Sequence, residues 1–155
     1  MRIRLLAVGT RMPAWVHTGI EEYRKRLPRD FALEIEEIAP GQRGKNADVA
    51  RAVALEAQRI RERLRGDELT VALEVEGQAW NTERLAREGE AWRLEGRDVV
   101  LMVGGPDGLS PELSASADRR WSLSPLTLPH PLVRVILAEQ LYRAWTLMVG
   151  HPYHR

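Results

Sequence analysis

The chain has 155 residues, of which 44% are hydrophobic, and this is enough for a buried core in a single domain that spans residues 1–155. It contains no cysteine, which excludes disulfides, thiolate nucleophiles and thiolate metal sites. Its 23 Lys and Arg residues nearly balance 22 Asp and Glu residues, so the net charge of +1 excludes a general electrostatic attraction to nucleic acid.

The sequence indicates neither a membrane span nor a secretion signal. No segment approaches the roughly eighteen uninterrupted apolar residues of a spanning helix. The first residues, MRIRLLAVGTRMP, hold only a short apolar run without a small-residue cleavage site. We therefore expect a cytoplasmic protein that makes no contact with a membrane.

Hydrophobic periodicity predicts strands and helices that alternate along the chain. In the first half we expect a strand at 3–8, a helix at 15–27, a strand at 32–38 and a helix from the cap Asp48 to residue 65. In the second half we expect a strand at 69–75, a helix from Asn81 or Thr82 to about residue 94, and a strand at 98–105. After these we expect a short helix capped by Ser110, a short strand at 121–124 and a last helix at 131–149. The alternation predicts an α/β fold, a mostly parallel sheet with helices on both faces. General topology rules favour an unknotted, flavodoxin-like strand order.

A glycine-rich segment, VGGPDGLSP, follows the strand at 98–105. Open α/β sheets bind ligands at the carboxyl ends of their strands, and Gly104, Gly105 and Gly108 would let the backbone approach a small molecule closely. The segment is neither GxGxxG nor GxxxxGK[ST], so the two common phosphate-binding loops are missing. A plain turn is an equally good interpretation of the glycines.

A second segment, SLSPLTLPHP, precedes the last helix and contains three prolines. Prolines restrict the backbone, so this loop is ordered in advance of any ligand. Its leucines and free backbone groups are typical of an adenine-type pocket. A rigid structural turn is the alternative.

The last helix is apolar around most of its circumference. Arg134 projects onto the same face as Ala138 and Leu141, so it either caps the helix edge, pairs with Glu139, or has a catalytic or ligand-binding role. A helix this apolar must be covered on two sides, and we expect a homodimer interface to provide the second cover.

Histidines and basic residues are the remaining candidates. The tail HPYHR holds a histidine that can accept a proton near neutral pH, but the histidines lack the spacing of a zinc site, so no metal is expected. Two basic segments, 23–26 with Arg29 and GQRGKN at 41–46, are either solvated surface or RNA contacts. The glycines of the second segment favour a loop.

Five segments together resemble one family: GTRMPAWV, GQRGKNAD, GRDVVLMVGGPDGLS, WSLSPLTLPHPLVRVILAEQLYRAW and the closing PYHR. They are similar to the ribosomal RNA large-subunit methyltransferase H family, which contains small S-adenosylmethionine-dependent enzymes of the SPOUT class. The resemblance covers nearly the whole chain. It implies a C-terminal trefoil knot, an obligate homodimer, and methylation of N3 of a pseudouridine in 23S rRNA, in the intersubunit stem-loop (helix 69) of the assembled ribosome.

The resemblance also implies a set of site residues. Cofactor contacts are expected at Leu73, Gly104, Gly105, Leu123, Ser124, Pro125, Leu126, Thr127 and Leu128. His154 is expected to accept the N3 proton, Tyr153 to help place the base, and Arg143 to hold a phosphate or the developing negative charge. The chain departs from the family pattern at Asp107, where glutamate is frequent, and at Pro131, where glutamine is frequent.

Two other functions stay open at this point. One is a non-catalytic ribosome-binding dimer, which the two ligand-binding loops disfavour. The other is a nucleotide-dependent enzyme of ordinary doubly wound topology, which the missing phosphate loops disfavour. For the methyltransferase, the low net charge predicts weak binding to naked RNA and dependence on the shape of the ribosome, with 41–46 and the tail as contacts.

Overall fold

One parallel sheet organises the structure, a computed structural model that describes residues 1–154. The strands are β1 (Arg2–Val8), β2 (Ala32–Ile38), β3 (Leu69–Ala79), β4 (Val99–Val103) and β5 (Arg119–Ser122). They lie in the order β2-β1-β4-β3-β5, and every neighbouring pair is parallel. The central strands β1 and β4 are buried nearly throughout, as is typical of strands covered on both faces.

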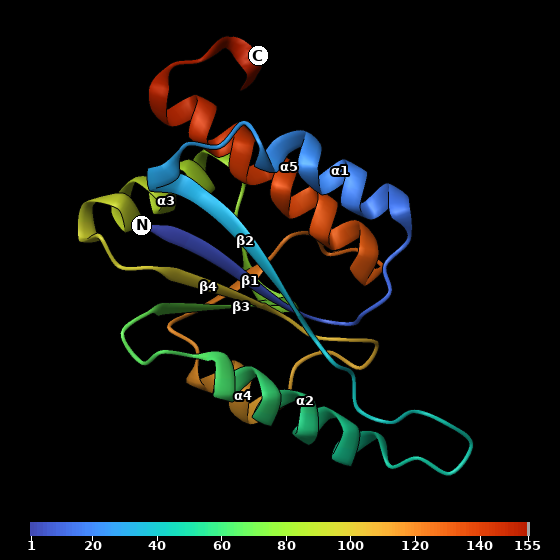
Figure 1. The fold of residues 1–155 in the computed structure, drawn as a ribbon. Helices are drawn as coiled ribbons and strands as arrows, with labels where there is room; N and C mark the ends of the chain where they lie inside the picture. The colour runs from blue at the N-terminus through green and yellow to red at the C-terminus, as the bar shows by residue number, and fades with distance from the viewer. Residues whose placement is uncertain (155) are drawn as a thin grey trace.

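Helices cover both faces of the sheet. Figure 1 shows α1 (Ala14–Arg24), α3 (Thr82–Glu95) and α5 (His130–Val149) on one face, and α2 (Val49–Arg63) and α4 (Pro111–Ser116) on the other. Two short 3-10 turns, η1 (Arg29–Phe31) and η2 (Pro152–His154), complete the described elements. The predicted α/β fold with helices on both faces is therefore confirmed.

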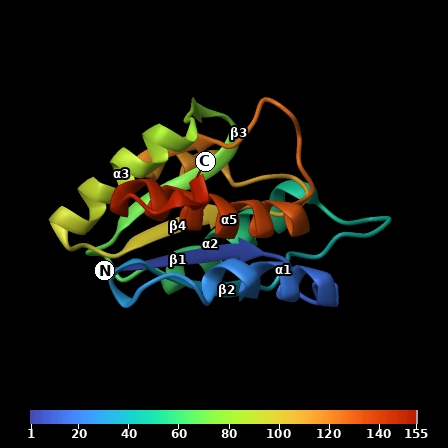
Figure 2. The same cartoon turned by 90° about the horizontal axis from the view of Figure 1, so that it is seen from above.

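The last helix lies in the middle of its layer. Figure 2 shows α5 between α1 and α3, and the contacts between these helices agree with that view. The two flanking helices cover much of the apolar circumference that we expected a second chain to cover. On the outer side Leu132 remains 37% exposed and Val149 50% exposed. Most of the cover that α5 requires is thus provided within the chain itself.

The strand order differs from the flavodoxin-like order that general topology rules favour. A flavodoxin-like sheet would place β3 beside β1, whereas here β4 pairs with β1, and β3 lies outside β4. The general rule failed because it favours sequential strands that lie side by side, whereas here β3 lies between β4 and β5. The trefoil knot that the family resemblance implies stays a prediction.

Most elements lie close to their predicted positions, and the predicted caps are confirmed. Asp48, Asn81 and Ser110 each accept a hydrogen bond from a backbone N–H in the first turn of the following helix. The larger differences are at β3, which continues past residue 75 to Ala79, and at β5, which begins at Arg119. Their pairing shifts register between Leu73 and Gln78, an irregularity that a strict two-residue period does not reveal.

A cluster of charged side chains around Arg4 connects β1 to neighbouring segments at the amino end of the sheet. Arg4 in β1 has a side chain only 3% exposed, and it pairs with Glu68, which is 2% exposed. Its guanidinium also donates to Glu36 Oε1 at 2.8 Å and to the carbonyl of Arg63 at 3.0 Å. Because Arg4 and Glu68 are both desolvated, loss of the cation would leave the Glu68 carboxylate buried without compensation.

We expect Arg4→Met to lower the free energy of unfolding by about 3 kcal/mol, because Glu68 then stays buried without a cation. Arg2→Met is the matched control, since the exposed Arg2–Glu34 pair contributes less than about 1 kcal/mol. Urea denaturation at one protein concentration measures both variants. Equal losses in the two variants would contradict the assignment.

Candidate functional site

A pocket of about 520 Å³ lies at the carboxyl end of β4, beside the middle of β3. Its wall comes from residues 73–76 of β3, from the segment 104–109 after β4, called here the glycine loop, from the segment 123–129 before α5, called the proline loop, and from the start of α5. The carboxyl edge of a parallel sheet is where α/β proteins bind ligands. The fold therefore brings the two loops that the sequence singles out into one site.

Eight of the nine residues expected to contact a cofactor line this pocket. They are Leu73, Gly104, Gly105, Leu123, Ser124, Leu126, Thr127 and Leu128. The ninth, Pro125, is exposed and does not line it. Their role toward a ligand stays a prediction, although their shared position is a finding.

The charged side chains in the pocket wall are acidic. Glu74, Glu76 and Asp107 line it, and no Lys or Arg within residues 1–154 does so. Glu74 accepts a hydrogen bond from Ser114 at 2.7 Å and pairs with Arg120. Such a wall favours a cationic ligand and disfavours one that carries several phosphates.

The glycine loop is a tight turn that requires Gly104. A Cβ on Gly104 would lie 2.6 Å from the carbonyl oxygen of Gly108, closer than real contacts allow. Gly105 and Gly108 form a bridge across the turn, and Gly108 has φ +75°. The glycine loop is thus a tight turn that also lines the pocket, so the two interpretations of the glycines do not exclude each other.

His130, which the sequence reasoning did not assign to the site, also lines the pocket. Burial, and then the positive charge of Arg134, lower the pKa of His130 from its ordinary value of 6.5. The imidazole is therefore neutral at pH 7 and can accept a proton. The signal in the sequence was its place between Pro129 and Pro131, which we interpreted only as a sign of rigidity.

Arg134 is buried and connects α5 to the sheet by hydrogen bonds, and it does not pair with Glu139. Its side chain is 2% exposed, and it donates to Glu37 Oε2 at 2.7 Å and to the carbonyl of Gly9 at 2.8 Å. The alternative that Arg134 pairs with Glu139 is wrong, because Arg134 faces the sheet, where the ends of β1 and β2 supply its acceptors. This contact fixes the first turn of α5, and with it His130.

The three expected catalytic residues gather at the other end of α5. Arg143 Nε donates to Glu139 Oε1 at 2.8 Å, and the Tyr153 hydroxyl donates to the same oxygen at 3.2 Å. Burial, and then the negative charge of Glu139, raise the pKa of Tyr153 to about 12, so the phenol stays protonated. Among the described residues, the buried Nδ1 of His154 has no hydrogen-bond partner.

This tail cluster is remote from the pocket of its own chain. His130 begins α5 and Arg143 lies toward its other end, so a rise of 1.5 Å per residue places them about 20 Å apart. Figure 1 shows α5 running away from the carboxyl edge of the sheet, with the C-terminus at the far end. One chain alone does not bring the tail residues to the pocket.

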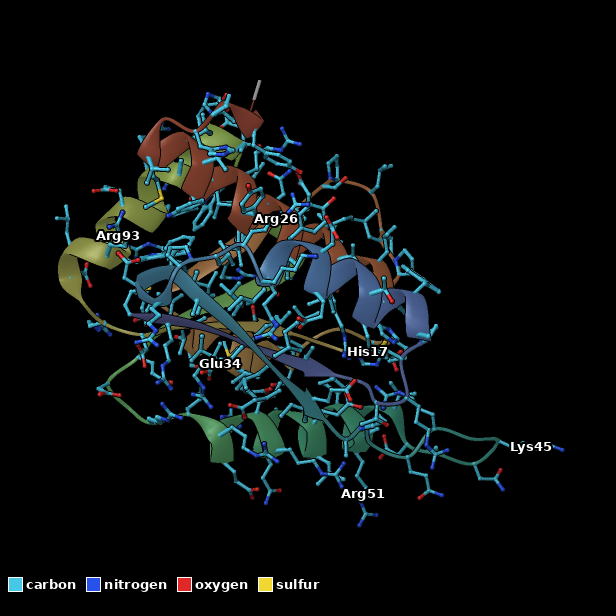
Figure 3. The ribbon with its side chains drawn as sticks, turned by 45° about the horizontal axis from the view of Figure 1, so that its top comes forward. His17, Arg26, Glu34, Lys45, Arg51 and Arg93 are labelled. Carbon is cyan, nitrogen blue, oxygen red and sulfur yellow. The ribbon has the colours of Figure 1, made fainter. Side chains whose placement is uncertain are left out.

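The two basic segments have different environments. In the first, Arg24 pairs with Glu21, and Lys25 and Arg26 both pair with Glu22, which favours ordinary solvated surface. The second is a loop whose exposed Lys45 projects from the body of the molecule, as Figure 3 shows. The loop at 41–46 is therefore the better candidate for a nucleic-acid contact.

The part of the chain that the structure describes contains neither a metal-binding cluster nor a membrane-spanning helix. Within residues 1–154, no three His, Asp or Glu side chains gather in a way that could hold a metal ion. No helix in that range is both long enough and apolar enough to cross a membrane.

His130→Gln is expected to remove one source of acid sensitivity. The folded-state pKa of His130 lies below 6.5, so on acidification the unfolded chain binds more protons, and stability is lost as the pH falls from about 6.5 through the lower folded-state pKa. Between about pH 7.5 and about pH 5.5 the parent chain should lose more free energy of unfolding than the variant, as urea denaturation measures. His17→Gln, at an exposed site, is the control. Identical pH profiles for His130→Gln and the parent would refute the assignment.

Comparison with known proteins agrees with the resemblance. The family model described as "Predicted SPOUT methyltransferase" matches residues 1–154. Over 100% of both chains, the sequence is 65% identical to a protein of Chromohalobacter salexigens and 59% identical to one of Pseudomonas aeruginosa. A protein of Pseudomonas putida is 57% identical over the same extent, and all three are named ribosomal RNA large subunit methyltransferase H. With a match along its described length and relatives this similar, the chain belongs to the SPOUT methyltransferase family.

Proposed function

We propose that the chain is an S-adenosylmethionine-dependent methyltransferase of 23S rRNA that methylates N3 of a pseudouridine in helix 69 on the assembled ribosome. The observation that carries the proposal is the pocket at the carboxyl edge of the sheet, with its acidic wall and its two converging loops. A full-length relative at 65% identity bears the name of a large-subunit rRNA methyltransferase. The finer assignment of base and atom comes from the sequence resemblance.

The residues of the pocket fit the proposed methyl donor. S-adenosylmethionine carries a sulfonium and an ammonium cation, and the wall offers three carboxylates, of which Glu74 pairs with Arg120 and Asp107 with Arg43. Leu123, Leu126 and Leu128 supply apolar contact for an adenine ring. The same wall argues against ATP or NAD, whose phosphates need cations or an N–H cradle.

Bound there, S-adenosylmethionine supplies an electrophilic methyl group. The task of the protein is then to align the acceptor nitrogen and to accept its proton. We assign proton acceptance to His154, placement of the base to Tyr153, and stabilisation of negative charge to Arg143. His130, which already lines the pocket in a neutral state, is the second candidate for the proton acceptor.

The distance between tail and pocket supports a homodimer in which one chain completes the site of the other. A tail about 20 Å away along α5 reaches a pocket only when it belongs to a second copy. Exposed apolar side chains on α1 and α5 provide surface for such an interface, notably Trp15, 54% exposed, and Val149, 50% exposed. Besides the second copy of the chain, the proposed partner is the ribosome in the cytoplasm. The chain would contact it through the loop at 41–46 and the tail.

Transfer of labelled methyl from S-adenosylmethionine to ribosomes that lack the modification tests the proposed reaction directly. We expect 3-methylpseudouridine by mass spectrometry of the nucleosides, and far less product on deproteinised rRNA because the net charge of +1 provides little general attraction. Ribosome binding without methyl transfer would instead favour the non-catalytic ribosome-binding dimer. Specific binding of ATP or NAD would favour the nucleotide-dependent enzyme.

His154→Ala should lower the methylation rate about 10²-fold or more while leaving donor and ribosome binding unchanged, because only proton acceptance is lost. His130→Gln, assayed beside it, decides between the two candidate bases. Full activity of His154→Ala would exclude the tail histidine as the base.

A mixture of two inactive variants tests whether the tail acts across the dimer. Gly104→Ala disrupts the pocket and His154→Ala disrupts the tail, so a mixed dimer keeps one intact pocket and one intact tail on different chains. If tails act across the interface, co-expressed variants recover about a quarter of the parental activity by statistical pairing. No recovery, despite mixed dimers shown by differential tagging, would mean that tail and pocket act within one chain.

A further inference from the structure

A buried carboxylate lies behind the glycine loop. Glu56 in α2 is 2% exposed, and its Oε2 accepts a hydrogen bond from the backbone N–H of Gly41 at 2.7 Å. The Arg43 guanidinium pairs with the same carboxylate through both terminal nitrogens, one of them donating to Oε1 at 3.1 Å. A fork of this kind fixes the orientation of the arginine.

The third nitrogen of Arg43 reaches the pocket wall. Its Nε donates to Asp107 Oδ2 at 2.9 Å, and Asp107 belongs to the glycine loop. A Cβ built on Gly105 would lie 3.8 Å from Glu56 Oε1, so the carboxylate is also directly next to the loop backbone. Neither Arg43 nor Glu56 lines the pocket itself.

The arrangement answers a problem that the glycine loop poses. Glycines leave a backbone free to adopt many conformations, so a loop made of them binds a ligand well only when something else holds it. On the pocket side Asp107 is exposed. On the side away from the pocket, Asp107 pairs with Arg43, and Arg43 in turn pairs with Glu56.

We propose that Arg43 and Glu56 are positioning residues for the pocket: Glu56 orients Arg43, and Arg43 holds the glycine loop through Asp107 in the conformation that binds the methyl donor. The inference rests on the proposed function, since it takes S-adenosylmethionine as the ligand. It also gives Arg43 of the basic loop at 41–46 a task that is independent of RNA.

Calorimetry with S-adenosylmethionine tests this inference on the full-length protein. We expect Glu56→Gln and Arg43→Met each to raise the donor Kd about tenfold, although neither side chain touches the pocket. In methyl transfer the KM for the donor should rise similarly, while kcat at saturating donor changes much less. Asp30→Ala is the matched control: it removes the Arg93–Asp30 pair, of 2.8 Å, at the other end of the sheet, and should leave the Kd unchanged.

A double-mutant cycle separates positioning from general damage. Arg43→Met in an Asp107→Ala background should add little to the effect of Asp107→Ala alone, whereas fully additive effects would overturn the proposal. Asp107→Glu keeps the carboxylate and should restore most of the affinity. Since Asp107 is exposed, its variants fold even where Arg43→Met loses stability by leaving Glu56 unpaired.

The two proposals fail differently in these measurements. A parent protein that does not bind S-adenosylmethionine refutes the proposed function. A parent that binds it, with an unchanged Kd in folded Glu56→Gln and Asp107→Ala, refutes the positioning role alone.

Discussion

The position of β3 outside β4 is the constraint on which the rest of the structure depends. Because β5 pairs with β3 at the edge, the chain must pass β3 after leaving β4 and then return to the centre of the sheet to begin α5. Each passage begins at the carboxyl edge, the first with the glycine loop and the second with the proline loop. The pocket between them is therefore a product of strand order, and local loop conformation only refines it.

Close backbone contacts make this arrangement possible. A Cβ on Gly77 would lie 2.7 Å from the carbonyl carbon of Trp121, so the extended end of β3 meets β5 only where a side chain is missing. Next to this contact Trp80 and Trp121 stack with their ring centres 5.0 Å apart. At the other wall Arg134 anchors the start of α5 to the ends of β1 and β2. The site is thus held by contacts that lie outside it.

The sequence predicted well what depends on local pattern. Strand and helix periodicity and the caps Asp48 and Ser110 follow from residue type and spacing, and so does the selection of the two loops that line one pocket. The strand order could not be predicted from the sequence. Parallel pairing joins residues as distant along the chain as Ile3 and Val99, and it leaves no signal in the residues next to either of them. The partners of Arg134 were missed for the same reason, since Glu37 and Gly9 are far from it in the chain.

The long-range pairing of β1 also has a consequence for how the chain folds. β1 is the first strand to be made, yet its partner β4 follows only after two other strands and three helices, so one side of β1 has no partner until most of the chain is available. Non-local parallel pairing of this kind slows folding, because the entropy of closing long loops is lost before stabilising contacts form. α5 packs on a sheet that must already exist, so it docks late. An emerging chain consequently presents the apolar edge of β1 to solvent, where early aggregation competes with completion of the fold.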